Sequence, residues 1–206
     1  MSESRQLQHA IRSGLAQVAD PQRAPAMQSY MKSAMPFYGV PRPVARTVFR
    51  AAIDAHPLES SPAWHDAVRL LWDEAGHREE WYAALAVAGH RRYAEFRAPA
   101  ALPLFEHLIR TGAWWDVVDE IASQLVGPLL RAYPQVRPTV LSWATADDLW
   151  QRRTAIICQL GAKQHTDLAL LTDSIEANLE GTAYGREFFI RKGIGWALRQ
   201  YGYVDP

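Results

Sequence analysis

The chain has 206 residues, a mass of 23.2 kDa and a formal net charge of zero, and it is 49% hydrophobic and 21% charged. These are the proportions of an ordinary globular chain, and folding at this length buries roughly 70% of the unfolded surface, so a core needs neither disulfide nor metal. The one cysteine, Cys158, excludes an internal disulfide and a Cys-based structural zinc site, and favours a reducing, cytoplasmic compartment. No apolar run approaches about 18 residues, so no membrane span is expected.

Helical periodicity accounts for almost the whole chain, and strand patterns are nearly absent. In chain order, the expected helices are 3–18, 22–34, 42–55, 62–74, 78–89, 99–111, 114–131, 135–144, 147–160, 166–179 and 185–202. Proline or glycine separates each helix from the next, and the short connections favour antiparallel neighbours. The expected fold class is therefore all-α.

Four of these helices begin with an aromatic-rich turn, at Arg78, Trp114, Asp147 and Arg186. Their starts are 36, 33 and 39 residues apart, and one further helix lies between each pair. This is the period of a solenoid of antiparallel helix pairs, in which stacked pairs share a core and leave one concave surface. A helical bundle with accidental spacing is the alternative.

The segment from Trp114 to Asp119, with the sequence WWDVVD, holds the first candidate site residues. On a helix, Trp115 and Asp119 are four residues apart and share a face, whereas Trp114 falls on the neighbouring apolar face. One tryptophan is therefore expected in the core and the other beside a carboxylate. The alternative is that both tryptophans pack and that the acids only favour the helix start.

The last expected helix carries a second stripe, in which Lys192, Trp196 and Arg199 share one face. Gly193 and Gly195 each cost about 1 kcal/mol in a helix interior relative to alanine. Two such costs beside a tryptophan indicate the close approach of a neighbouring helix or of a ligand backbone. The apolar packing positions expected on this helix are Phe188, Phe189, Ile190, Ile194 and Leu198.

Four arginines supply further candidates. Arg152 and Arg153 form a pair in the preceding repeat, of which one can point into the groove, and a solvated pair is the alternative. Near the N-terminus, Arg42 and Arg46 follow a Pro-rich turn, and donors at a helix N-terminus suit a phosphate. A plain turn between helices is the alternative there.

Other chemistries lack their motifs. The seven histidines are scattered, with no HExxH and no close pair at ligand spacing, and there is no phosphate loop, GxGxxG or GxSxG. Cys158 lies in an apolar run and is expected in the core. We therefore expect no metal and no cofactor.

Together these segments resemble the AlkD-like DNA alkylation repair family, which are helical-repeat DNA glycosylases. The resemblance rests on Tyr30–Lys32 with Gly39–Val40, Trp114–Asp119, Trp150–Leu160, and Glu187–Trp196 with Leu198–Arg199, and so covers most of the chain in order. It implies one domain over residues 1–206, a solenoid of HEAT-like helix pairs with a concave DNA-binding groove. The chain stops at Pro206, so the expected domain lacks the C-terminal helical segment with which relatives usually continue.

The resemblance also implies roles for individual residues. Trp115 and Trp196 correspond to the aromatic groups that flank the lesion's sugar, Asp119 to the catalytic carboxylate, and Arg153 to the cleft arginine. The candidate DNA contacts are Tyr30, Lys32, Arg42, Arg46, Lys192 and Arg199. The implied activity is monofunctional release of N3- and N7-alkylated purines from double-stranded DNA, by a cytoplasmic monomer that acts at the nucleoid.

Elementary chemistry fits these roles. An alkylated purine is cationic and leaves readily, so the enzyme has mainly to stabilise an oxocarbenium-like sugar and orient water, which a carboxylate can do. Asp119 is expected to be an exposed carboxylate of the groove and not a core residue, so Asp119→Asn should keep the fold and lose excision. A non-catalytic DNA-structure-binding paralogue and a protein-binding helical scaffold remain the alternative functions.

Overall fold

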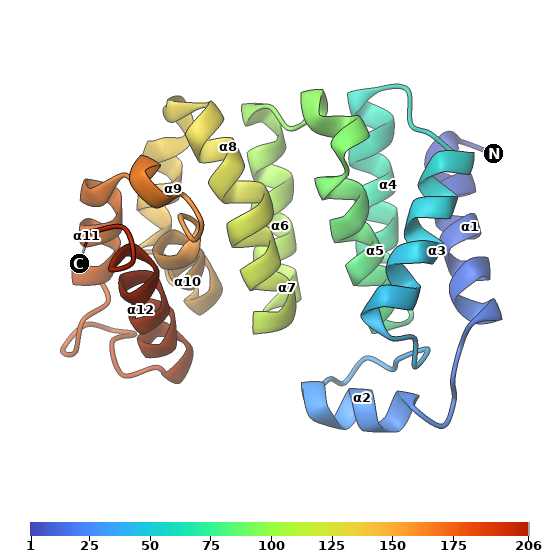
Figure 1. Ribbon diagram of the computed structural model, residues 1–206, viewed down its shortest axis with the longest axis horizontal. Helices are drawn as coiled ribbons and strands as arrows, with labels where there is room; N and C mark the ends of the chain where they lie inside the picture. The colour runs from blue at the N-terminus through green and yellow to red at the C-terminus, as the bar shows by residue number, and fades with distance from the viewer. Residues whose placement is uncertain (206) are drawn as a thin grey trace. The chain divides into compact units, whose positions relative to one another are not determined.

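A computed structural model describes residues 1–205, and every regular element in that range is helical, which confirms the predicted all-α class. The chain divides into two compact units, residues 1–96 and the part that begins at Arg97 (Figure 1). Along the described chain, no helix is both long and apolar enough to cross a bilayer. The single domain and its concave groove stay predictions.

The first unit contains α1 (Glu3–Gln17), α2 (Ala24–Met31), α3 (Arg42–Ala55), α4 (Ser61–Asp73) and α5 (Arg78–Gly89), followed by a 3-10 segment, Arg91–Phe96. Helices α1 and α5 both pack against α3 and α4, and in the view of Figure 1 the short α2 runs across their ends. The core side of α1 follows from its apolar spacing, since Leu7, Ile11 and Leu15 are four residues apart and fully buried.

The loop before α3 is fixed by a buried carboxylate. Glu79 of α5 is fully buried and accepts the backbone N–H groups of Tyr38, Gly39 and Val40, each at 3.0 Å. Gly39 has φ +83°, and a Cβ there would lie 2.1 Å from the Asp20 carbonyl oxygen, so only glycine fits. These contacts hold the backbone of the loop that leads into α3.

The second unit contains α6 (Leu102–Gly112), α7 (Trp115–Glu120), a π-helical segment (Ile121–Val126), α8 (Gly127–Ala132), α9 (Arg137–Trp143), α10 (Leu149–Ile157), α11 (Leu168–Glu176) and α12 (Phe188–Tyr201). Three 3-10 turns join them, Pro99–Ala101, Pro134–Val136 and Lys163–His165. Helix α10 is central, because α6, α7, α9, α11, α12 and the π-helical segment all pack against it. Its residues are buried from Trp150 to Ile157.

Helices α7 and α8 and the segment between them form one run, close to the predicted helix 114–131, but the π-helical turn was not predicted. Pro128 has no N–H for the usual bond to the fourth residue before it, and its ring crowds that carbonyl, so a wider turn relieves the conflict. Next to it, a Cβ on Gly127 would lie 2.0 Å from the Cys158 carbonyl oxygen. The Ser123 hydroxyl donates to the Asp119 carbonyl at 2.7 Å, where the α-helical turn gives way to the π-helical one.

Cys158 is fully buried, as predicted, and burial raises the pKa of its thiol to about 12. Two predicted packing positions of α12 are wrong, because Phe188 and Leu198 are 63% and 52% exposed. Ile190, another of the predicted packing positions, is buried, and with Gly193 and Ala197 it forms the buried face of α12 at the helical period.

Candidate active site

Asp119 of α7 and Arg153 of α10 form a two-point ion pair. The Arg153 Nε donates to Asp119 Oδ1 at 2.7 Å, and Nη2 donates to Oδ2 at 2.8 Å. The Arg153 side chain is 5% exposed and that of Asp119 is 18% exposed. Asp119 is therefore not the freely exposed carboxylate that we expected, since both of its oxygens accept from Arg153 and most of the side chain is buried. Such paired bonds fix the plane of a carboxylate as well as its position.

The third nitrogen of the Arg153 guanidinium is also engaged. Its Nη1 donates to the backbone carbonyl of Phe189 in the first turn of α12, and its Cζ lies 5.9 Å from the centroid of the Phe189 ring. One buried side chain on α10 thus links α7 to α12. Nothing in the sequence indicated that the backbone carbonyl of Phe189 accepts a hydrogen bond from Arg153.

The two glycines of α12 differ in their surroundings. A Cβ on Gly193 would lie 3.2 Å from Nη1 of Arg153 and 3.4 Å from Cγ2 of Ile157, whereas a Cβ on Gly195 would meet nothing within 4 Å. The close approach expected from these glycines is therefore that of a neighbouring helix, α10, and it applies to Gly193 alone.

The predicted aromatic and basic residues of the second unit lie on α7 and α12. Trp115 begins α7 one turn before Asp119, on the same helix face, and is half-buried. Trp196 is half-buried on α12, while Lys192 and Arg199 on the same helix are exposed. The structure thus pairs Asp119 with Arg153, and the contacts predicted for the other four with DNA stay predictions.

Trp114 packs, as the sequence suggested for one tryptophan of the pair. Its ring centroid lies 5.4 Å from that of Phe189 and 6.1 Å from that of Trp150, and the last two are 5.0 Å apart. This aromatic cluster lies among α7, α10 and α12, the same three helices that Arg153 links.

Arg152 is structural, and a solvated arginine pair is excluded because Arg152 is only 8% exposed. Its Nη2 donates to the Thr145 carbonyl at 2.9 Å, its Nη1 donates to the Asn178 side-chain oxygen at 3.2 Å, and its Cζ lies 4.5 Å from the Tyr184 ring centroid. Arg152 therefore secures the turn after α9 against the end of α11.

The first unit holds the other predicted DNA contacts. Tyr30 is 76% exposed, and Lys32, exposed with φ 50°, ends α2 in the left-handed conformation. Arg42 is the first residue of α3, and its Cζ lies 3.5 Å from the centroid of the Tyr82 ring, while Arg46 one turn later is exposed. The α3 N-terminus has no side-chain cap, which keeps the predicted phosphate contact open as a prediction.

Sequence reasoning missed the buried acids of α5. Glu80 is 1% exposed and accepts from Arg12 Nε at 2.8 Å and from the Tyr38 hydroxyl at 3.2 Å. Burial, followed by the nearby Glu80 carboxylate, raises the pKa of Tyr38 to about 12. Acids in a first helical turn usually serve the helix dipole in water, so nothing in the sequence indicated burial.

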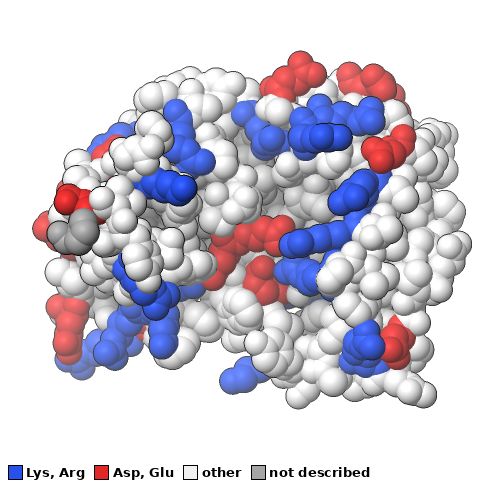
Figure 2. Space-filling model, viewed as in Figure 1, with Lys and Arg blue, Asp and Glu red and all other residues white. Residues whose placement is uncertain are grey.

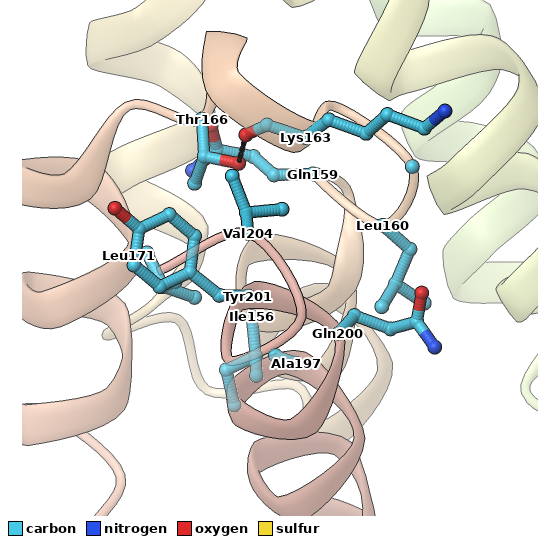
Figure 3. A pocket seen from close by; sticks show the side chains of 11 residues that line it. Ile156, Gln159, Leu160, Lys163, Thr166, Leu171, Ala197, Gln200, Tyr201 and Val204 are labelled. Atoms are coloured by element: carbon cyan, nitrogen blue, oxygen red, sulfur yellow. Dashed lines mark hydrogen bonds between the residues drawn. The ribbon is translucent and has the colours of Figure 1, made fainter. Parts of the chain in front are cut away.

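Two surface features of the second unit have neither Asp119 nor Arg153 among their lining residues. Figure 2 shows basic side chains gathered over one end of α12, where Arg186, Arg191 and Lys192 line a hollow with the exposed Phe188. Figure 3 shows a pocket at the other end of α12, and no predicted site residue lines it. Within residues 1–205, no three His, Cys, Asp or Glu side chains come together as metal ligands would.

The fold and the site define an all-helical protein of packed helix pairs, in which a buried arginine fixes a partly exposed carboxylate. The family model of DNA alkylation repair enzymes matches residues 11–206, and the chain belongs to this family. It is also similar to a solved structure, a predicted DNA alkylation repair enzyme from Enterococcus faecalis, with 28% identity and a TM-score of 0.77 over 91% of this chain and 85% of that chain. No curated protein matches the chain.

Proposed function

We propose that the chain is an AlkD-like, monofunctional DNA glycosylase that hydrolyses the N-glycosidic bond of N3- and N7-alkylated purines in duplex DNA. The observation that carries this proposal is the Asp119 carboxylate, held through both oxygens by Arg153 and still 18% exposed. A carboxylate fixed in this way keeps its orientation when a positive charge develops beside it. Such preorganisation is what makes an electrostatic group effective in catalysis.

The reaction needs little else from the protein. The C1′–N bond breaks and its electron pair goes to the cationic base, which leaves neutral while positive charge develops on the sugar. Asp119 stabilises that charge and orients a water molecule, whose oxygen bonds to C1′ and whose proton passes to the carboxylate. Trp115, on the same face of α7 as Asp119, adds cation–π attraction worth about 0.5–2 kcal/mol. Trp196 has the same role from α12.

The remaining proposed residues bind DNA. Lys192 and Arg199 are exposed on α12, where phosphates can reach them, and the corresponding contacts in the first unit are proposed for Tyr30, Lys32, Arg42 and Arg46. A lyase step would need an amine nucleophile. The basic group in contact with Asp119 is the guanidinium of Arg153, which is not an amine nucleophile. We therefore propose hydrolysis alone, without metal or cofactor.

The test is single-turnover release of 7-methylguanine from methylated duplex DNA at saturating enzyme, which separates chemistry from binding. Asp119→Asn should lower the rate about 10²–10³-fold, the usual loss for an electrostatic group of this kind. The matched control is Asp173→Asn, which removes an exposed carboxylate from α11 and should leave the rate unchanged. A wild-type protein that binds the duplex but releases no base would refute the proposal and favour a non-catalytic DNA-structure-binding protein.

A further inference from the structure

We propose that Gly193 is a positioning residue that sets the orientation of the Asp119–Arg153 pair. Its effect on excision rests on the function proposed above, whereas its effect on the pair does not. The observation is the space that the missing side chain leaves, since a Cβ on Gly193 would lie 3.2 Å from Nη1 of Arg153.

Gly193 leaves the Phe189 carbonyl open to Arg153. In an α-helix the carbonyl of one residue points toward the residue four positions later, so the Phe189 carbonyl lies beside Gly193. With no side chain at that position, Nη1 of Arg153 reaches this carbonyl and donates to it. The glycine therefore makes room both for the donor and for the path to its acceptor.

The guanidinium has little freedom to move away from a larger residue. It is buried, its Nε and Nη2 are bonded to the two Asp119 oxygens at 2.7 and 2.8 Å, and its Nη1 is bonded to Phe189. A planar guanidinium turns as one body. A Cβ that displaces Nη1 by a few tenths of an ångström will therefore also turn the carboxylate of Asp119. Gly193 thus acts on the catalytic group through Arg153.

Gly195 provides a matched control on the same helix. A Cβ at this position meets nothing within 4 Å, and the gain in helix propensity from Gly→Ala is the same at both positions, about 1 kcal/mol. The two variants, Gly193→Ala and Gly195→Ala, differ only in what the new methyl group touches. A change seen in the first and absent from the second therefore cannot come from helix propensity.

The experiment compares the two variants in three measurements. The Arg153 Nε–H resonance, assigned by its absence from Arg153→Lys, should shift in Gly193→Ala and stay in place in Gly195→Ala. Single-turnover excision by Gly193→Ala should fall about tenfold while affinity for the duplex changes by less than about twofold, because the fault lies in the geometry of the reacting groups. Gly195→Ala should match the wild type in both activity and affinity.

The outcomes are separable. An unmoved Arg153 resonance in Gly193→Ala would overturn the inference, and so, where the wild type excises, would excision by Gly193→Ala equal to that of Gly195→Ala. A wild-type protein without excision would overturn the proposed function alone, because the resonance still tests whether Gly193 orients the pair. If Gly193→Ala does not fold, the same substitution is made in Arg153→Lys, whose side chain has no Nη1. Arg153→Lys alone is the control: a double variant that folds as this control does supports the inference, and one that unfolds where the control folds contradicts it.

Discussion

Removing Asp119 and removing Arg153 should lower the free energy of unfolding by different amounts. Asp119→Ala removes both acceptors and leaves a 5% exposed guanidinium with one carbonyl partner. Breaking a buried pair costs about 3–5 kcal/mol, and the 18% exposure of Asp119 puts the expected cost near the lower end, at about 3 kcal/mol. Arg153→Met leaves a carboxylate that water can reach, so its cost should be about 1–2 kcal/mol.

The double variant gives the decisive comparison. Replacing both charges with apolar groups removes the buried unpaired charge, and such replacements are often neutral. Asp119→Ala with Arg153→Met should therefore be about 1–2 kcal/mol more stable than Asp119→Ala alone. Urea unfolding followed by circular dichroism measures this as a higher midpoint at an unchanged slope. A double variant less stable than Asp119→Ala would refute the claim that the arginine is the buried partner. Excision should be lost in Asp119→Ala, in Arg153→Met and in the double variant, so the double variant regains stability but not activity.

Two further predictions concern DNA contact and pH. Lys192→Ala and Arg199→Ala should weaken duplex binding about equally for all sequences, and each should lower the slope of log affinity against log salt concentration by about 1, because fewer counterions are released. Lys163→Ala removes an exposed lysine outside the predicted set and should leave this slope unchanged. Equal slopes in all three variants would contradict the assignment. The Arg137 side chain, hydrogen-bonded to Asp167 at 2.6 Å, holds the pKa of Asp167 below its ordinary range, so this stabilisation is present at neutral pH and is lost as pH falls from about 4 downward. Asp167→Asn should therefore flatten the fall in urea midpoint below about pH 4, and an unchanged acid dependence would show that other carboxylates cause it.

The helices were largely predictable because their boundaries are set locally. The predicted and observed ranges agree closely for α3 and α5, and Pro or Gly marks most of the breaks. Pro128 marks an irregularity in this helix, but the local sequence pattern does not give whether the helix breaks there or continues through the π-helical segment Ile121–Val126. Periodicity reports which face of a helix is apolar, but it does not report how closely two backbones approach.

The candidate site was predictable in its residue types but not in its contacts. Asp119 and Arg153 were named separately, from a shared helix face and from an arginine pair, and no pattern indicated that they bond to each other. Arg152 and Arg153 are adjacent in sequence, yet one secures a turn and the other holds a carboxylate. Gly193 and Gly195 also could not be told apart in the sequence, because only the position of α10 distinguishes their surroundings.

The order of the two charges, arginine inside and carboxylate toward solvent, matters for the proposed reaction. A bare carboxylate would repel the phosphates of an approaching duplex, whereas a carboxylate paired with Arg153 belongs to a neutral pair and adds little to that repulsion. When positive charge develops on the sugar, it lies nearer to the exposed carboxylate than to the guanidinium behind it, so the attraction exceeds the repulsion. The pair therefore interacts weakly with the bound ground state and strongly with the transition state, which is the condition for catalysis by differential binding. A reversed order, with Asp119 buried and Arg153 outward, would attract phosphates and oppose the developing charge.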